Sequence, residues 1–150
     1  MTLDPSIPEQ RAMVVAEALD WVGTPYHHAA RIKRVGVDCA HLLLVVFVAV
    51  GLVEDFTPEP YPHDWHLHRS EERFLAVVEQ FATEITRDRL ELGDVLLFRW
   101  GRTFAHGAIY IGDDRVVHAN IRDGEVTIGE LSRDGELFER PTRYFSIWSS

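Results

Sequence analysis

Hydrophobic and polar positions divide this chain into a helical first half and a strand-rich second half. A first helix is expected to begin at Ser6, because a serine followed within three residues by proline and glutamate is typical of a helix start. The Gly-Thr-Pro sequence at residues 23–25 should end it, since glycine favours a helix C-terminus and proline cannot continue one. Its apolar side is expected to comprise Met13, Ala16, Leu19 and Trp21.

The most apolar stretch, residues 40–52, is expected to form the central helix of the fold. Its many β-branched residues would allow a strand, but its length and uniform apolarity favour a helix that is buried all round and ends near Gly51. The stretch is too short to cross a bilayer, which takes about 20 apolar residues. An irregular loop is expected over residues 57–69, followed by a helix from Ser70 to about Ile85.

The second half has the short apolar or alternating runs that are typical of β-strands. The turn Gly112-Asp113-Asp114-Arg115 indicates a hairpin between two of these strands. Helices followed by antiparallel strands predict an α+β fold, and the length of 150 residues fits one domain spanning residues 1–150. The expected strands are residues 95–98, 106–111, 116–120, 126–131 and 143–148.

Composition and charge exclude some classes of function. The formal net charge of −9 disfavours nucleic acid as a partner, because phosphate binding needs clustered lysine and arginine. A single cysteine excludes an intramolecular disulfide. The first ten residues lack a basic segment followed by an apolar core, so we expect no signal peptide, synthesis in the cytoplasm and no insertion into a membrane.

Cys39 stands where a loop enters the central helix. The unpaired N–H groups at a helix start carry partial positive charge, which favours a thiolate and is expected to lower the thiol pKa. Such a thiolate is a nucleophile for acyl transfer, and the same N–H groups can donate to an oxyanion. The alternative is that Cys39 is a small buried residue packed against its helix.

His106 and His118 lie on the two strands of the predicted hairpin, and the register decides whether they share a face. A plain two-residue turn pairs Ile109 with His118 and places His106 on the opposite face. A three-residue or bulged turn pairs Ala108 with His118, and then both histidines and Asn120 share one face. A catalytic role therefore predicts a three-residue or bulged turn. The alternative is two half-buried polar residues on a solvated sheet face.

Together these residues suggest cysteine–histidine acyl chemistry. His106 would accept the thiol proton of Cys39, or form a thiolate–imidazolium pair with it, and would later protonate the leaving amine. His118 would hold the imidazole of His106 in the tautomer that this transfer needs.

Four motifs occur in a fixed order: ALDWVGTPY (18–26) with GVDCAHL (36–42), LGDVLLF (92–98), HGAIYIG (106–112) and VVHA (116–119). In this order they resemble the signatures of the NlpC/P60 family of cell-wall cysteine peptidases. The resemblance implies a papain-like α+β fold, catalytic roles for Cys39, His106 and His118, and no cofactor. It also implies a peptidoglycan stem peptide as substrate, often cut between D-glutamate and the diamino acid.

The resemblance also suggests where substrate binds. Tyr26 matches the tyrosine near the nucleophile, whereas Ala40-His41 replaces the usual Ser-Gly after the cysteine. His41 is expected to be a helix-surface or pocket-wall residue. The candidate substrate-binding residues are Tyr26, Asp38, His41 and Trp65.

Residues 61–72 resemble the phage and prophage tail-associated branch of that family. This resemblance implies phage tail proteins as partners and an enzyme that reaches the cell wall with the virion. Other interpretations stay open: a catalytically silent tail assembly module, or an amidase, deamidase or acyltransferase with the same triad. A metal site is a further alternative, but the spacing fits no zinc pattern and we expect no metal. Its ligands would be His63, Asp64, His66 and His68.

Overall fold

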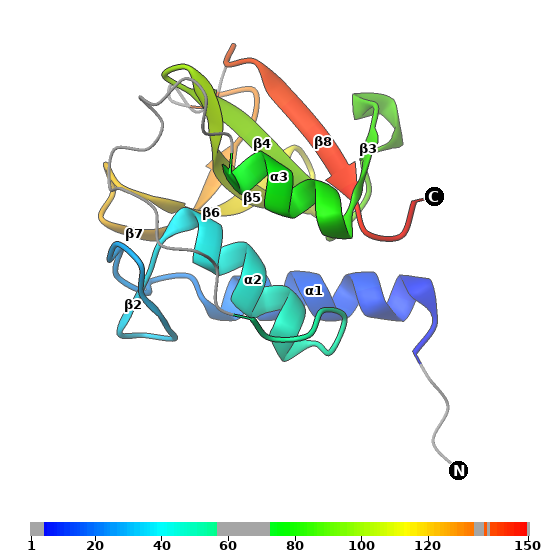
Figure 1. Cartoon of the computed structure of the whole chain (residues 1–150), viewed down its shortest axis with the longest axis horizontal. Coiled ribbons are helices and arrows are strands. Elements are labelled where there is room, and N and C mark those ends of the chain that lie inside the picture. Colours follow the sequence, from blue (N-terminus) through cyan, green and yellow to red (C-terminus); the bar gives the residue numbers. More distant parts are fainter. Residues whose placement is uncertain (1–4, 57–72, 134–136, 138, 150) are drawn as a thin grey trace.

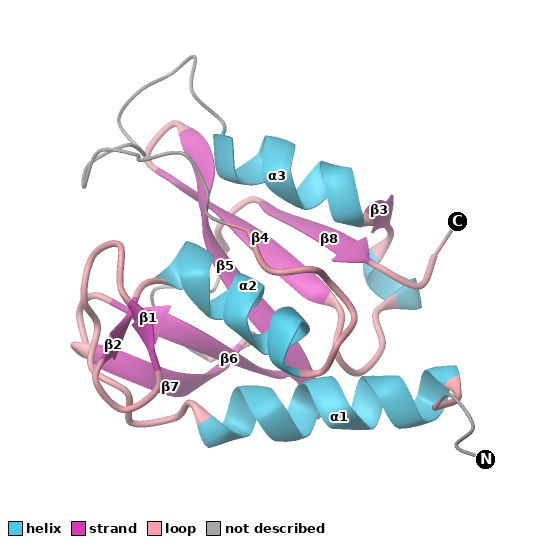
Figure 2. Ribbon diagram, turned by 60° about the horizontal axis from the view of Figure 1, so that its bottom comes forward, coloured by secondary structure: helices cyan, strands magenta, loops and turns pink. Residues whose placement is uncertain are grey.

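The computed structural model describes residues 5–56, 73–133, 137 and 139–149. In this part of the chain, three α-helices lie against one face of a six-stranded antiparallel sheet, so the expected α+β fold is confirmed (Figures 1 and 2). The helices are α1 (Ile7–Asp20), α2 (Cys39–Ala49) and α3 (Arg73–Phe81).

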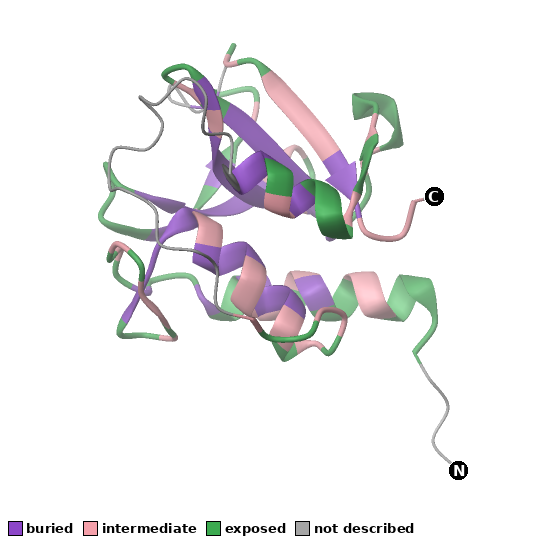
Figure 3. Ribbon diagram, in the orientation of Figure 1, coloured by how far each residue is buried: buried purple, intermediate pink, exposed green. Residues whose placement is uncertain are grey.

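The sheet has the strand order β3-β8-β4-β5-β6-β7. Its central strands β4 and β5 are largely buried (Figure 3). Their buried residues in the core shared with the helices are Val95, Leu97, Ala105, Ile109 and Ile111. A short hairpin of β1 (Arg31–Ile32) and β2 (Gly36–Val37) and a 3-10 turn (Arg87–Arg89) complete the described elements. The sheet strands are β3 (Thr83–Ile85), β4 (Val95–Trp100), β5 (Thr103–Gly112), β6 (Arg115–Asn120), β7 (Glu125–Glu130) and β8 (Thr142–Ser146).

Helix α1 begins as expected but buries a different side. The Ser6 side chain accepts a hydrogen bond from the backbone N–H of Glu9, which caps the helix. The apolar residues lie on more than one side of this helix, so packing on the sheet decides which side is buried. Buried residues are Val14, Ala18 and Trp21, so of the expected stripe only Trp21 was right; Met13, Ala16 and Leu19 are exposed.

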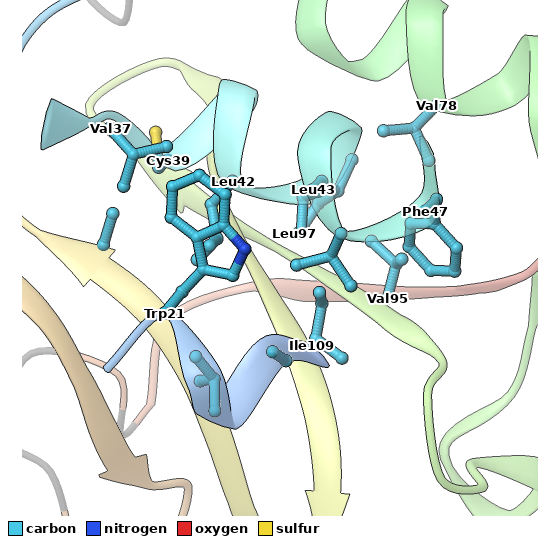
Figure 4. Packing of buried hydrophobic residues seen from close by; sticks show 14 of the residues in the cluster. Trp21, Val37, Cys39, Leu42, Leu43, Phe47, Val78, Val95, Leu97 and Ile109 are labelled. Carbon is cyan, nitrogen blue, oxygen red and sulfur yellow. The ribbon is translucent and has the colours of Figure 1, made fainter. Parts of the chain in front are cut away.

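Helix α2 confirms the expectation of a buried central helix. Every residue from Cys39 to Val48 is buried or half-buried, and the chain turns at Gly51 with a φ of 78°. One side of the helix, with Ala40, Leu44, Val45 and Val48, is only half-buried, so the expectation that the helix is buried all round was right in part. The contacts of its buried side outweigh the strand preference of its β-branched residues. Figure 4 shows its first turn, where Cys39 lies beside Val37 above the shared core.

Helix α3 is shorter than expected. It ends at Phe81, and Thr83–Ile85 forms β3, which pairs with β8. The prediction that the helix continues to Ile85 was therefore wrong. Residues 83–85 instead form backbone hydrogen bonds with β8, and these are incompatible with a helix. The expected start at Ser70 and the expected loop over residues 57–69 lie outside the described residues.

The hairpin of β5 and β6 contains the bulge that a catalytic role predicted. Gly112 pairs with Arg115 across two residues with positive φ, and the register then shifts before Tyr110 pairs with Val116. Ile109 pairs with Val117 rather than with His118. Continued along the strands, this register sets Ala108 opposite His118, so both histidines share a face.

Gly107 lets two helices approach β5. A Cβ at this position would lie 2.6 Å from a ring carbon of Phe74 on α3 and 2.8 Å from a methyl carbon of Leu43 on α2. We expect Gly107→Ala to lower the free energy of unfolding by about 1–3 kcal/mol, because the core has no room for a methyl group. Urea unfolding measures this loss. Phe74→Leu should reduce the cost of Gly107→Ala, and an equal cost in both backgrounds would contradict the steric explanation.

Candidate active site

Cys39 lies at the start of α2, against the backbone of β5. The pairing of β5 with β6 reaches only Ile109 and Val117, and further along β5 the backbone faces the Cys39 sulfur instead. The thiol donates a hydrogen bond to the carbonyl oxygen of Ala105 at 3.4 Å. The N–H of Gly107 is directed at the same sulfur. The sulfur of Cys39, the candidate nucleophile, therefore contacts the backbone of the residues just before and just after His106.

His106 and His118 form a buried hydrogen-bonded pair. His106 Nε2 lies 2.8 Å from His118 Nδ1, and the two rings meet edge to face at 82°. The side chains come from β5 and β6, and only 7% and 1% of the two residues are exposed. If His106 Nε2–H donates to His118 Nδ1, the Nδ1 of His106 carries the lone pair. This tautomer makes His106 a base, which is the arrangement that the proposed chemistry needs.

The surroundings of His106 hold its imidazole neutral. Burial lowers its pKa well below the ordinary value of 6.5, and the neighbouring His118 and Arg140 lower it further. Burial disfavours the charged imidazolium, and so does a guanidinium nearby. A neutral imidazole at neutral pH can accept a proton.

The pKa of the Cys39 thiol is raised to about 12, chiefly by burial and then by the carboxylate of Asp38. The N–H groups of Gly107, Ala40 and Cys39 act in the opposite direction and are outweighed. The expectation of a lowered thiol pKa at this helix start was therefore wrong. The helix N-terminus does favour a thiolate, but a buried sulfur loses more hydration energy than these groups return.

Asp38 and His41, which flank Cys39 at the start of α2, are hydrogen-bonded to each other. One carboxylate oxygen of Asp38 accepts hydrogen bonds from the backbone N–H and from Nδ1 of His41, both at 2.9 Å. The other oxygen accepts from the N–H of Ala29 at 2.7 Å. Asp38 thus caps α2 and holds the preceding loop in place. His41 is buried, 7% exposed, rather than on the helix surface.

Tyr26 lies beside Cys39, as its motif position implied. Its hydroxyl interacts with the Cys39 side chain, and its pKa is raised by burial and then by Cys39 and Asp38. The side chain is half-buried. It is therefore placed to contact a substrate that reaches the thiol.

Several predicted residues fall outside the described part of the chain. Trp65 is one of them, and so are the four residues of the alternative metal site. Among the described residues, no group of three or more histidine, cysteine or acidic side chains could hold a metal ion. Within the same residues, no helix combines the length and apolarity needed to cross a membrane.

Two residues near His106 had not been singled out from the sequence. Trp100 ends β4, and its ring centroid lies 4.8 Å from that of His106. Arg140 precedes β8, and its guanidinium lies 3.7 Å from the centroid of the Trp100 ring. Their sequence positions, one beside a predicted strand end and one near the C-terminus, carry no motif signal, because only the pairing of β4 with β8 brings them together.

The raised thiol pKa has a direct consequence for alkylation. We expect iodoacetamide to modify Cys39 slowly at pH 7, and the rate should still rise above pH 9, because folding keeps the thiol protonated beyond its ordinary range. Asp38→Asn keeps a helix-capping side chain but removes the negative charge, so the rate at pH 8 should rise several-fold. Mass spectrometry after timed quenching measures the rate. A fast, pH-independent reaction between pH 6 and 8 would show instead a stable thiolate.

Known proteins share both the sequence motifs and the fold of this chain. The family model described as "NlpC/P60 family" matches residues 23–139. The chain is 28% identical over 131 residues to dipeptidyl-peptidase 6 of Lysinibacillus sphaericus, covering 87% of the chain and 40% of that protein. It is 29% identical over 116 residues to murein DD-endopeptidase MepS/murein LD-carboxypeptidase of Escherichia coli, covering 77% and 53%.

The chain thus spans about half or less of the length of these curated relatives. Among solved structures, the NlpC/p60 domain of peptidoglycan hydrolase SagA superimposes with a TM-score of 0.61 at 22% identity, covering 89% of this chain and 96% of that one. This similarity confirms the fold that the motifs implied.

Proposed function

The chain belongs to the NlpC/P60 family, and from this premise we propose that it is a cysteine peptidase acting on amide bonds of peptidoglycan stem peptides. In this proposal Cys39 is the nucleophile, His106 the general base and His118 the residue that orients the base. The observation that carries it is the 2.8 Å hydrogen bond between His106 and His118, beside the strand backbone that holds the Cys39 thiol.

The reaction begins from a neutral thiol and a neutral imidazole. As the sulfur of Cys39 attacks the carbonyl carbon, its proton passes to His106 Nδ1, since Nε2 is engaged by His118. Negative charge develops on the carbonyl oxygen, and the N–H groups of Cys39 and Ala40 at the start of α2 can stabilise it. The imidazolium of His106 then gives its proton to the leaving amine.

The acyl-enzyme that remains is a thioester on Cys39. A water molecule attacks it while His106 accepts a proton, and the carboxylic acid product leaves as the thiol is restored. An amine in place of water would give transfer instead of hydrolysis. The His106–His118 pair can accept a proton from water or from an amine, so only the product shows whether the reaction is hydrolysis or transfer.

Peptidoglycan as the substrate class rests on the relatives and the motifs. One relative is named a murein endopeptidase and another a dipeptidyl-peptidase, which supports peptide bonds of the cell wall as the target here. The bond proposed is the one between D-glutamate and the diamino acid. Of the described candidates for substrate binding, Tyr26 is half-buried and open to a direct contact, whereas Asp38 and His41 are 1% and 7% exposed and would act by holding the start of α2. Trp65 is added to this set from the sequence.

The test is digestion of purified stem peptides and muropeptides, followed by liquid chromatography and mass spectrometry. Wild type is expected to release a new amine and a new carboxylate at one bond, and Cys39→Ala is expected to release neither. A folded wild type that leaves every peptide intact would refute peptidase activity and favour the silent assembly module. A product carrying an added amine would identify an acyltransferase.

We further propose that the enzyme acts as one catalytic domain carried by a phage or prophage tail. The resemblance of residues 61–72 to tail-associated members supports this, although that segment lies outside the described residues. Mass spectrometry of purified particles from a producing strain should detect the chain together with tail proteins. Its presence only in the cell fraction would contradict the proposal.

A further inference from the structure

Trp100 connects the proposed base to a cation. The indole lies against the His106 imidazole, with ring centroids 4.8 Å apart and ring planes inclined by 42°. The Arg140 guanidinium lies over the same indole, 3.7 Å from its centroid. A guanidinium over an indole at this distance is an attractive contact, and it stiffens both side chains. Arg140, Trp100 and His106 therefore form a series of side chains in contact, which leads from a half-buried cation to the buried imidazole of the proposed base.

The sheet holds this series in place. Arg140 donates a hydrogen bond from its guanidinium to the carbonyl of Arg99 at 3.0 Å, and the N–H of Arg99 donates to the carbonyl of Pro141 at 2.9 Å. The register between β4 and β5 shifts between Phe98 and Trp100, which sets the indole at the end of its strand. One hydrogen bond from the Arg140 side chain and one between backbone groups therefore tie the segment just before β8 to β4, and they hold Arg140 beside Trp100.

The charge of Arg140 acts on the base. Within the described residues, the titratable or charged groups that influence His106 are His118 on β6 and Arg140 before β8. A positive charge beside a buried imidazole disfavours the imidazolium, so it adds to the effect of burial and lowers the pKa of His106. The thiol of Cys39 is neutral as well, because burial and Asp38 raise its pKa.

We propose that Arg140 is a positioning residue for His106: stacked on Trp100, it fixes the indole against the imidazole and keeps the imidazole in its neutral, proton-accepting form. The proposal rests on the proposed function, since it concerns the base of that reaction. Its consequence is an enzyme that keeps a working base at acidic pH. Without Arg140, protonation of His106 would begin at higher pH and remove the base.

A titration of the protein itself tests the charge effect without any substrate. The histidine ring signals of ¹³C,¹⁵N-labelled protein are followed by NMR against pH, and His106 is assigned from the spectrum of His106→Asn. We expect the pKa of His106 to rise by about one pH unit in Arg140→Gln. Arg140→Lys keeps the charge and should stay close to wild type. Arg87→Gln removes the same charge from an exposed pair with Asp114 and should change nothing.

Stem-peptide hydrolysis gives the second readout. In Arg140→Gln the acid limb of kcat/KM should move to higher pH by the same amount, with little change at pH 8. An unchanged His106 titration in Arg140→Gln, or an equal change in Arg140→Lys, overturns the proposal. A raised KM with no movement of the limb also overturns it and marks Arg140 as a substrate contact. A wild type that cleaves no peptide refutes the proposed function, whereas the NMR titration still decides the role of Arg140.

Discussion

Replacing His106 with alanine is expected to lower kcat/KM for stem-peptide hydrolysis by about 1,000-fold or more. The thiol of Cys39 has a raised pKa and is not ionised at neutral pH, so it depends on a base to lose its proton during attack. An enzyme with a preformed thiolate would keep more activity without the base. In this site the loss should therefore approach that of Cys39→Ala.

His118→Ala is the informative companion of His106→Ala. It keeps His106, the proposed base, but removes the ring whose Nδ1 lies 2.8 Å from His106 Nε2. We expect a loss of about 10²-fold, because His106 then samples wrong tautomers and orientations. His27→Ala serves as the control, since that histidine is exposed and should leave activity unchanged. Initial rates over pH 5–9 measure all variants.

Circular dichroism and urea unfolding separate lost chemistry from lost structure, since both histidines are buried. A folded His106→Ala protein that keeps more than a tenth of wild-type activity would show that another group accepts the proton. A loss in His118→Ala as large as in His106→Ala would make His118 an equal partner in proton transfer rather than an orienting residue.

Replacing Arg11 with methionine is expected to lower the free energy of unfolding by about 3–5 kcal/mol. Arg11 donates to the Asp94 carboxylate at 2.9 Å and to the carbonyl of Leu92 at 2.9 Å, and its guanidinium lies over the Trp148 ring. The Asp94 side chain is fully buried. Methionine keeps much of the apolar stem but leaves a buried carboxylate with no cation beside it.

A second substitution tests this explanation. Asp94→Asn removes the charge, so the double variant Arg11→Met with Asp94→Asn should recover part of the lost stability. Arg87→Gln removes an exposed arginine that pairs with Asp114 and should cost less than about 1 kcal/mol. Urea unfolding followed by tryptophan fluorescence measures the free energy of unfolding of wild type, Arg11→Met, the double variant and Arg87→Gln. A double variant less stable than Arg11→Met would show that the arginine acts through packing instead.

This ion pair ties the helical layer to the sheet. Arg11 comes from α1, whereas Asp94 immediately precedes β4, the strand that pairs with β5 and its histidine. Asp94 also accepts a hydrogen bond from the N–H of Glu91, which closes the turn before the strand. We therefore expect a loss of activity in Arg11→Met to follow its loss of fold and to recover in the double variant.

Local features of the sequence predicted the frame of the site. The length and apolarity of residues 40–52 predicted the central helix, and the loop before it placed Cys39 at its start. The alternation of strand side chains turned the question of a shared histidine face into a question of register. The bulge between Tyr110 and Gly112 then confirmed the register that a catalytic pair requires. These features depend on neighbours in sequence, which is why they could be inferred.

Other features depend on which distant segments meet. Two sides of α1 were similarly apolar, and the sheet selected Val14 and Ala18. Hydrogen bonds to β8 converted residues 83–85 into a strand, although the sequence alone favoured helix. Burial and the Asp38 carboxylate reversed the expected shift of the Cys39 pKa, because the hydration of the sulfur depends on everything packed around it.

The elements that carry the candidate residues, and the order of those residues along the chain, were therefore predictable from the sequence, since helix starts, strand alternation and turn type are set by local geometry. The protonation states of those residues were decided by the tertiary structure. So was the series of Arg140, Trp100 and His106, which joins a residue near the C-terminus to the end of β4 and to β5. No local pattern encodes such a contact, because it exists only once the sheet has paired β4 with β8 and β5.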